Sequence, residues 1–367
     1  MLKKLFLCLF VFFSSLLLAT GVCALDISAE RAIVIEYDSQ DIIYQKNAFD
    51  KAPMASTTKI MTAIIAIENY PLDKKIRIPS EAVGVEGSSI YLKDGEVLTM
   101  RELLYALLLE SANDVASAIA ITVGGDTEHF ADLMNQKASE LGLKGTHFCN
   151  PHGLDDENHY TTAHDLAIIA RYAMGLDDFR KIVSTYKKEI PLGDDGTRYL
   201  INHNKLLKGY EGAIGVKTGF TKKSGRCLVS CAEKDGVCLI AVTLNAPNDW
   251  NDHKRMLDYG FERYECINLA RVGDYSLSLN CVNGIKSSVL CSNLDNLNIT
   301  IEKGKSSNLR AVFEADRFLF APVSKGDLVG KIVYYLDDVK IASLDIYATE
   351  SVKSINYKKS IFERIFG

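Results

Sequence analysis

A run of apolar residues that starts beside a lysine is the feature that most constrains the fold of this chain. The segment from Ile60 to Ile67 places apolar side chains on nearly every side of a helix, which predicts a buried helix. Ser56 and Lys59 stand at its start, three residues apart, so their side chains share one face. A lysine on a buried helix is costly unless its amine is paired or neutral. A neutral amine beside a hydroxyl predicts an activated nucleophile.

The first 24 residues differ from the rest of the chain. Lys3 and Lys4 precede an apolar run from Leu5 to Leu18, and the small residues around Ala24 end it. This pattern predicts a secretory signal peptide over residues 1–24, cut after Ala24. An uncleaved membrane anchor is disfavoured because the apolar run is short. A lipoprotein that is cut before Cys23 is also disfavoured, because the valine that precedes this cysteine is bulky. We therefore expect an exported protein at the outer face of the cytoplasmic membrane or in the cell wall.

Charge and cysteine content give no support for nucleic-acid binding or for a metal site. Without Lys3 and Lys4 the chain carries 40 basic and 47 acidic side chains, so nothing favours nucleic-acid binding. Of nine cysteines, seven remain after the signal, an odd number without metal-ligand spacing. Cys231 and Cys238 flank a turn and could lie opposite each other on a hairpin, although most of the cysteines read as small buried residues. We expect neither a metal nor a cofactor.

The pattern of elements predicts an α+β fold. An antiparallel sheet flanked by helices is expected with an all-helical subdomain, followed by a small all-β domain. The predicted divisions are a catalytic domain over 25–264, a β-domain over 265–349, and a basic amphipathic tail over 350–367 that lies on a membrane surface. The alternative for the tail is a helix docked on its own domain.

Individual elements follow from periodicity and turn residues. Strands are expected over 32–37, 42–44, 213–220, 227–231 and 237–242, and a strand and turn over 88–96. Helices are expected from Met100, around 115–120, over 126–142, after a cap near Thr162, and from Asp249 to Tyr264. Ser111 and Asn113 then stand at a junction between two apolar helices, where both side chains can point inward.

Three short motifs stand in order along the chain: Ser56-x-x-Lys59, Ser111-x-Asn113 and Lys217-Thr218-Gly219. Each is weak alone, and Ser184 to Lys187 also matches the first pattern. Only the match at Ser56 is followed by the other two, at separations of 55 and 106 residues that leave room for a helical subdomain. This set is typical of penicillin-binding proteins and class A β-lactamases.

The chain resembles the low-molecular-weight penicillin-binding proteins, the serine-type D-alanyl-D-alanine carboxypeptidases of peptidase family S11. The likeness covers roughly residues 26–264, and the β-domain and tail resemble the same family less specifically. Besides the three motifs, it rests on the stretches 87–92, 150–154 and 162–167. The resemblance implies a β-lactamase/transpeptidase-like fold, a peptidoglycan stem peptide ending in D-Ala-D-Ala as substrate, and β-lactams as inhibitors.

Acyl transfer needs a nucleophile, a base and a route for the proton. Ser56 is expected to attack the carbonyl of the penultimate D-alanine, with Lys59 as general base. Ser111 can relay a proton towards the leaving amine, and Asn113 can hold the substrate amide. His152 and His164 lie in matching stretches, where a structural role is favoured over catalysis.

The third motif supplies the anchor for the substrate. Lys217 adds positive charge that keeps the base deprotonated and attracts the terminal carboxylate, while Thr218 donates a hydrogen bond to it. Gly219 lets the strand approach the substrate backbone. By resemblance, the backbone N–H groups of the nucleophile and of Phe220 form the oxyanion hole. Arg226 is a further candidate for the carboxylate.

Two other functions remain open from the sequence. A class A β-lactamase deacylates with a glutamate in a Glu-x-x-x-Asn pattern, and no glutamate between Asn113 and Lys217 has an asparagine four residues on. A non-catalytic wall-binding protein would not need Lys59. The sequence leaves open the physiological stage, transpeptidase side activity, the oligomeric state and the role of the β-domain.

Overall fold

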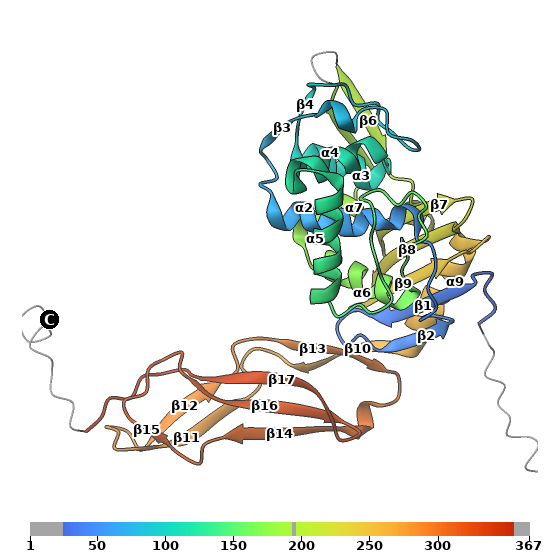
Figure 1. Ribbon diagram of the computed structural model, residues 1–367. Coiled ribbons are helices and arrows are strands. Elements are labelled where there is room, and N and C mark those ends of the chain that lie inside the picture. The colour runs from blue at the N-terminus through green and yellow to red at the C-terminus, as the bar shows by residue number, and fades with distance from the viewer. Residues whose placement is uncertain (1–24, 193–195, 356–367) are drawn as a thin grey trace, which may run out of the picture.

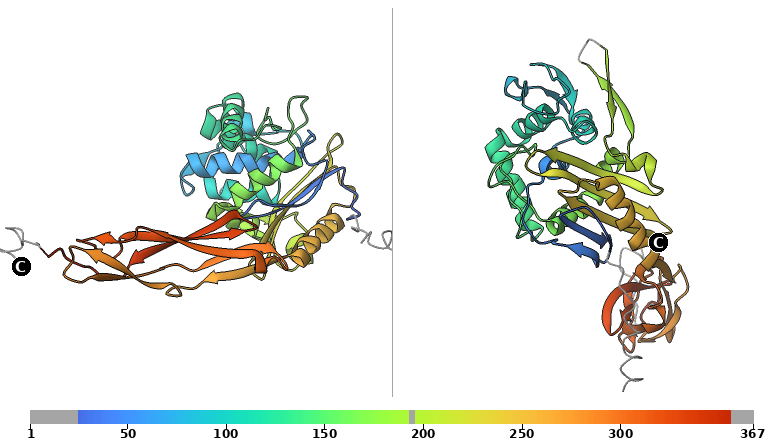
Figure 2. Two further views of the ribbon diagram at one scale, coloured as in Figure 1. Left: turned by 90° about the horizontal axis from the view of Figure 1, so that it is seen from below. Right: turned by 90° about the vertical axis from the view of Figure 1, so that its right-hand side faces the viewer.

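The computed structural model describes residues 25–192 and 196–355 of the 367-residue chain (Figure 1). The predicted signal peptide and residues 356–367 of the predicted tail lie outside the described residues. The described chain forms an N-terminal domain with a sheet and helices, and an elongated C-terminal β-domain (Figures 1 and 2).

A five-stranded antiparallel sheet with the order β2-β1-β9-β8-β7 is the base of the N-terminal domain. Residues of β1 alternate between two cores: Ile33 and Ile35 join the helical side, whereas Ala32 and Val34 pack with α9. All of β9 is buried because α6 and α9 cover both faces of the sheet. The strands are β1 (Arg31–Glu36), β2 (Ile42–Lys46), β7 (Ala213–Thr221), β8 (Gly225–Lys234) and β9 (Val237–Leu244), and the helices α6 (Ala163–Met174) and α9 (Asp249–Arg263).

The helical subdomain is built around α2 (Lys59–Asn69), which is buried along most of its length and contacts the surrounding helices. The predicted cap near Thr162 is present: its hydroxyl accepts the Asp165 N–H at the start of α6. At the start of α3 the Thr99 hydroxyl accepts the Glu102 N–H, a capping box that was not predicted. The surrounding helices are α3 (Met100–Leu109), α4 (Asn113–Gly124), α5 (Thr127–Glu140) and α7 (Asp177–Val183). Two small two-stranded sheets, the 3-10 turn η2 (Ser80–Ala82) and the short helix α8 (Leu206–Gly209) complete the domain; the sheets pair β3 (Lys75–Arg77) with β4 (Val97–Thr99) and β5 (Lys187–Pro191) with β6 (Thr197–Ile201).

The strand predicted within 88–96 is wrong. This segment is irregular, and Tyr91 has a left-handed φ of 57°. The buried Asp114 carboxylate accepts the Leu92 N–H at 3.0 Å and the Ser89 hydroxyl at 2.6 Å. A side chain therefore satisfies polar groups that a neighbouring strand would otherwise have paired.

The β-domain follows α9 directly and has its own core. A two-stranded ribbon pairs β10 (Tyr264–Ala270) with β13 (Leu297–Glu302), and a six-stranded sheet has the order β14-β16-β17-β12-β11-β15. Its far end carries β15 and the last described residues (Figures 1 and 2). The sheet strands are β11 (Ser276–Val282), β12 (Ser288–Ser292), β14 (Leu309–Ala315), β15 (Leu319–Phe320), β16 (Leu328–Leu336) and β17 (Val339–Ala348), and the 3-10 turn η3 (Ser306–Asn308) precedes β14.

The predicted α+β class, with an antiparallel sheet, a helical subdomain and a C-terminal all-β domain, is confirmed. Val352 and Ser354, at the start of the predicted tail, form bridges to Val323 and Gly284 of the β-domain. Among the described residues, none of the helices has the length and apolar character needed to cross a bilayer.

Candidate active site

The Ser56–Lys59 pair lies where a 3-10 turn, η1 (Ala55–Thr58), passes into α2. The α-helix thus begins at Lys59, not at Ser56 as expected from the sequence. Ser56 is half-buried and faces a cavity, whereas Lys59 is 0% exposed. The Lys59 amine lies 3.0 Å from Ser56 Oγ, 2.6 Å from Asn113 Oδ1 and 2.6 Å from the His152 carbonyl oxygen.

These three contacts fix the direction of the bond between nucleophile and base. Asn113 Oδ1 and the His152 carbonyl can only accept hydrogen bonds. A neutral amine has two N–H donors, which these oxygens occupy, and one lone pair, which is left for the third neighbour. The Ser56 hydroxyl therefore donates to Lys59 whenever the amine is neutral.

The surroundings favour the neutral amine. Burial lowers the pKa of Lys59 well below its ordinary value, and the nearby positive charge of Lys217 lowers it further. The negative charge of Asp114 acts in the opposite direction but does not cancel these effects. A neutral amine bonded to a serine hydroxyl is the arrangement that general-base activation requires.

Ser111 and Asn113 lie at the break between α3 and α4, as the sequence predicts. Ser111 has a left-handed φ of 62° and is 5% exposed, and it lines the same cavity as Ser56. This unfavourable backbone conformation turns the hydroxyl towards the nucleophile's cavity. The Asn113 amide nitrogen donates to the Glu86 carbonyl at 2.6 Å, so both ends of that side chain are held.

The third motif lies on β7, the edge strand of the sheet. Lys217 is 1% exposed, and burial lowers its pKa to about 7, partly opposed by Glu110. Its amine donates to the Thr218 carbonyl at 3.0 Å. A Cβ on Gly219 would lie 3.1 Å from the backbone nitrogen of Ser56, so only a glycine allows β7 to approach η1 without displacing it.

All three motifs contribute to one cavity of about 350 Å³. Arg226 also reaches it: the guanidinium bonds the buried Asp249 carboxylate at 2.9 Å and lies 5.8 Å from the Trp250 ring centroid. In the β7–β8 pairing Arg226 lies opposite Phe220, which is 64% exposed. The cavity is lined by Ser56, Ser88, Ser111, His203, Lys205, Thr218, Gly219, Phe220, Arg226, Asp249 and Trp250.

Sequence reasoning missed Ser88, His203, Lys205, Asp249 and Trp250 as lining residues. Trp250 is the single tryptophan of the chain and follows directly on Asp249, which was a usable signal. The acceptor role of the His152 carbonyl had no signal, because every residue carries a backbone carbonyl.

A buried hydrogen-bonded chain supports the nucleophile's turn. The Cys149 N–H donates to His159 Nδ1 at 3.0 Å, so His159 Nε2 carries the proton that it donates to Thr58 Oγ1 at 2.7 Å. The Thr58 hydroxyl in turn donates to the Ala55 carbonyl at 2.8 Å. Burial lowers the pKa of His159 to about 4, so the ring is neutral in this chain of hydrogen bonds at pH 7.

The two histidines singled out from the sequence have structural contacts. Burial lowers the pKa of His152 to about 3, and its Nδ1 accepts the Leu154 N–H at 3.2 Å. His164 packs against Phe49 at 4.8 Å between ring centroids and lies 3.3 Å from an Asp165 oxygen.

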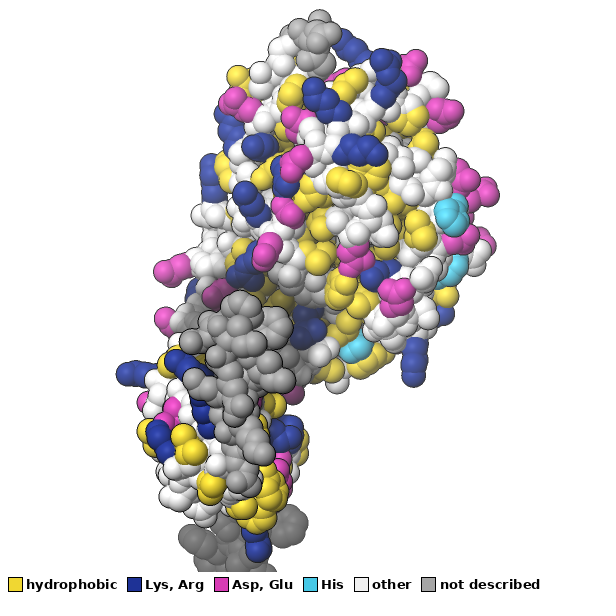
Figure 3. All heavy atoms as spheres, turned by 90° about the vertical axis from the view of Figure 1, so that its left-hand side faces the viewer, with side chains coloured by type: hydrophobic (Ala, Val, Ile, Leu, Met, Phe, Trp, Pro, Cys, Tyr) yellow, Lys and Arg dark blue, Asp and Glu magenta, His cyan; other side chains and the backbone are white. Residues whose placement is uncertain are grey.

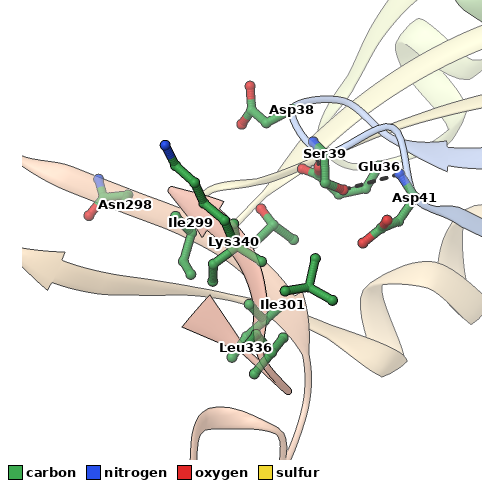
Figure 4. Close-up of a pocket in the computed structure, with 12 residues that line it drawn as sticks. Glu36, Asp38, Ser39, Asp41, Asn298, Ile299, Ile301, Leu336 and Lys340 are labelled. Atoms are coloured by element: carbon green, nitrogen blue, oxygen red, sulfur yellow. Dashed lines mark hydrogen bonds between the residues drawn. The ribbon is translucent and has the colours of Figure 1, made fainter. Parts of the chain in front are cut away.

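A second cavity, of about 410 Å³, lies between the β1–β2 turn and the β-domain (Figure 4). Glu36 lines it and is 0% exposed. One carboxylate oxygen of Glu36 accepts the Ser39 N–H at 2.6 Å, and the other has no hydrogen-bond partner. Burial raises the pKa of this carboxyl.

Neither metal ligation nor a cysteine centre is indicated in the described part of the chain. Within residues 25–192 and 196–355, no three His, Cys, Asp or Glu side chains gather in a way that could hold a metal ion. The seven cysteines there are free thiols. Cys231 Sγ and Cys238 Sγ lie 3.5 Å apart, although the strand register pairs Cys231 with Ile240, so the two cysteines are diagonal neighbours.

Comparisons with known proteins identify the family of the chain. Residues 19–248 match the family model for D-alanyl-D-alanine carboxypeptidase of peptidase family S11, and residues 264–354 match the model for the C-terminal domain of penicillin-binding protein 5. The chain is 33% identical to D-alanyl-D-alanine carboxypeptidase DacF of Bacillus subtilis, over 90% of this chain and 87% of the relative. It is 29% identical to DacA of Escherichia coli K12, over 93% and 89%.

Solved structures give the same result. Penicillin-binding protein 5 from Haemophilus influenzae superposes with a TM-score of 0.70 at 29% identity, over 91% of this chain and all of that one. PBP3 from Streptococcus pneumoniae, at 24% identity, shares the fold with a TM-score of 0.78, over 89% of this chain and all of that one. The chain therefore belongs to the D-alanyl-D-alanine carboxypeptidases of peptidase family S11, a family of hydrolases within the penicillin-binding proteins.

Proposed function

We propose that this protein is a serine-type carboxypeptidase that removes the terminal D-alanine from peptidoglycan stem peptides through an acyl-enzyme on Ser56. The observation that carries the proposal is the Lys59 amine 3.0 Å from Ser56 Oγ, with carbonyl oxygens occupying its two N–H donors. Family membership supports the class of reaction, and this geometry supports the assignment of Ser56 and Lys59.

Acylation begins when the Ser56 oxygen attacks the carbonyl carbon of the penultimate D-alanine. Lys59 takes the hydroxyl proton, and the backbone N–H groups of Ser56 and Phe220 stabilise the oxyanion, since β7 lies against η1 at this point. The carbon–nitrogen bond breaks, and the leaving amine receives the proton through Ser111. Water then hydrolyses the ester and regenerates Ser56.

The substrate is held as an added strand. The outer edge of β7 borders the cavity, so an extended peptide can pair with it while the Asn113 amide contacts the peptide backbone. Lys217, Thr218 and Arg226 supply positive charge and a hydroxyl for the terminal carboxylate. The Asp249 carboxylate fixes the direction of the Arg226 guanidinium.

β-Lactams present a strained amide to the same serine and are expected to acylate it. A Ser56→Ala variant tests the assignment: D-alanine release from a Lys-D-Ala-D-Ala peptide falls to background, and the mass added by penicillin in intact-mass spectrometry disappears. Penicilloyl mass on a residue other than Ser56 contradicts the proposal. Sustained hydrolysis of nitrocefin by the wild-type protein would instead favour a β-lactamase, and folded protein with neither activity would favour a wall-binding role.

The proposed location follows from the two ends of the chain. Residues 1–24 direct export with a cut after Ala24, and the basic amphipathic tail attaches the protein to the outer face of the cytoplasmic membrane. Co-sedimentation with anionic vesicles tests the attachment, and protein that stays in the supernatant contradicts it.

A further inference from the structure

The far end of the β-domain exposes a group of apolar side chains that the proposed reaction does not use. They come from the end of β11, the loop after it, the β15 segment and the end of the described chain. We name this group the apolar tip: Val282 (42% exposed), Ile285 (63%), Phe318 (43%), Phe320 (67%) and Ile355 (65%).

Strand pairing brings the first part of the tip together. β15 runs parallel to the end of β11, with Cys281 beside Leu319 and Val282 beside Phe320. Cys281 and Leu319 belong to the core of the β-domain, so the next residue of each strand points outward. Phe318 is on the same outward side as Phe320, with ring centroids 5.3 Å apart.

Backbone hydrogen bonds place the two isoleucines at the same end. The Ile285 N–H donates to the Lys353 carbonyl at 2.8 Å, and the Ile355 N–H donates to the Asn283 carbonyl at 2.9 Å. The last described residue is therefore part of the tip, and residues 356–367 leave the domain from it. That segment contains Ile361, Phe362, Ile365 and Phe366 among Lys358, Lys359 and Arg364.

We propose that the apolar tip itself enters the lipid surface beside the tail, so that the membrane contact includes a folded part of the β-domain. This inference rests on the proposed attachment by the tail and adds a second, rigid contact to it. Exposed apolar patches of this kind mark interaction sites. A bilayer is the occupant that fits, because an amphipathic basic segment leaves the domain from the patch itself.

The charges around the tip are compatible with a lipid headgroup region. Figure 3, in which this end faces the viewer, shows yellow apolar and dark blue basic side chains together on the β-domain, with some magenta acidic ones. Four basic and two acidic side chains are exposed near the tip, and Glu350 is paired with one of the basic ones; the exposed residues are Lys286, Arg317, Lys325 and Lys353, with Asp316 and Asp327. The apolar side chains can therefore enter the acyl boundary while basic groups stay among the headgroups.

The first test uses the purified exported protein with residues 356–367 retained. A Phe318→Ser/Phe320→Ser variant is expected to bind vesicles of phosphatidylglycerol and phosphatidylethanolamine about tenfold or more weakly than wild type, because two aromatic side chains leave the lipid. The matched control is Val272→Ser/Val339→Ser, which removes two exposed valines (57% and 65%) outside the tip and should bind like wild type. The deficit of the tip variant should persist at high salt, which screens the basic tail.

The second test places a reporter at the tip. The natural chain has one tryptophan, in the active-site cavity, so the wild-type protein gives the baseline. Phe320→Trp should shift to shorter emission wavelength on vesicle binding and be quenched by brominated lipid, whereas Val339→Trp should show neither effect.

The inference is overturned by equal vesicle binding of the tip variant and wild type, by an equal loss in the control variant, or by bound Phe320→Trp protein that brominated lipid does not quench. A change in self-association without a change in vesicle binding would make the tip a protein contact, which also overturns it. Wild-type protein that binds no vesicles would contradict tail and tip together. Failure of the proposed catalysis is recognised separately, since D-alanine release from a soluble peptide does not depend on the tip.

Discussion

Glu36 lines its cavity and is 0% exposed; Lys59, also 0% exposed, lies behind Ser56, which lines the other cavity. At Ser56, every hydrogen-bonding position of the neutral Lys59 amine has a partner. At Glu36, one carboxylate oxygen has none. The cavity at Glu36 is the larger of the two, at about 410 Å³ against 350 Å³.

The larger of the two cavities is therefore not the one that contains the proposed reaction site. A buried amine whose partners select its neutral form is prepared for proton transfer. The buried Glu36 carboxyl, with one oxygen that has no hydrogen-bond partner, only raises the free energy of the folded state. It lies where the two domains meet. Each of the following experiments changes a residue at or beside one of these two cavities.

The largest effect is expected from Lys59→Met, which removes the base but keeps an unbranched side chain of similar length. D-alanine release should fall by about 10²–10⁴-fold, the usual contribution of general-base catalysis. Lys187→Met is the matched control: this lysine belongs to the chance match at Ser184, is exposed, and packs on Tyr199 at 5.0 Å. Steady-state kinetics on both variants check the prediction, and equal losses would mean that the amine at 59 has no special role.

A smaller effect is expected from Asn113→Ala, which removes an acceptor from Lys59 and a donor from the Glu86 carbonyl. We expect about a 10²-fold loss of D-alanine release and about 1–3 kcal/mol of lost stability, because buried polar groups lose their partners. Asn293→Ala separates the two effects, since Asn293 is buried in the β-domain, where its side chain bonds backbone groups of Arg271, Tyr275 and Asp295. That control should lower the melting temperature and leave kcat unchanged; a matching loss of kcat would contradict the assignment.

The pH dependence of KM tests whether the positive charge of Lys217 holds the substrate. The Lys217 pKa of about 7 in the free enzyme means that its positive charge is lost as pH rises through 7. The KM for a D-Ala-D-Ala peptide should therefore increase above pH 7, by up to about tenfold per pH unit. In Lys217→Arg the guanidinium keeps its charge, so KM should stay level to pH 9.

The slope of KM against pH is compared within each variant, so a lower overall activity of Lys217→Arg does not affect the conclusion. A wild-type KM that is flat from pH 6 to 9 would show that the charge of Lys217 does not hold the substrate.

The smallest effect is expected at the other cavity. The pKa of Glu36 is raised in the folded state, so the cost of its carboxylate is present above that pKa and disappears as pH falls towards the ordinary value of 4.5. Glu36→Gln keeps an oxygen for the Ser39 N–H and should raise stability by about 1 kcal/mol at pH 8, with no difference near pH 4.

Thermal unfolding at the two pH values checks this prediction, with exposed Asp132→Asn on α5 as the control and D-alanine release unchanged in both variants. A gain that is the same at pH 4 and pH 8 would exclude ionisation of Glu36 as its cause.

Much of the site was predictable because its residue types and their spacing along the sequence identify it. The apolar run after Lys59 predicts a buried helix, and the order of the three motifs separates Ser56 from Ser184. The structure brings the predicted residues of all three motifs to one cavity or to its wall, Arg226 included. Their chemical roles stay predictions.

The other features of the site and the fold could not be predicted from the sequence, because they depend on backbone atoms and on packing between distant segments. The carbonyl of His152 that completes the Lys59 site has no residue preference. The segment 88–92 has the composition of a strand, yet the Asp114 carboxylate takes its polar groups. The orphan oxygen of Glu36 arises only where the two domains meet, and neither domain's sequence pattern shows it.

The complete burial of Lys59 also bears on where a proton can go during turnover. In the proposed mechanism Lys59 takes the Ser56 proton; its amine exposes no surface to water, and its other hydrogen-bond neighbours are two carbonyl oxygens that cannot carry the proton away. With a peptide filling the cavity, that proton is isolated from the bulk solvent. Its outlet is then the departing D-alanine, so bond breaking and proton return are tied together by the architecture of the site.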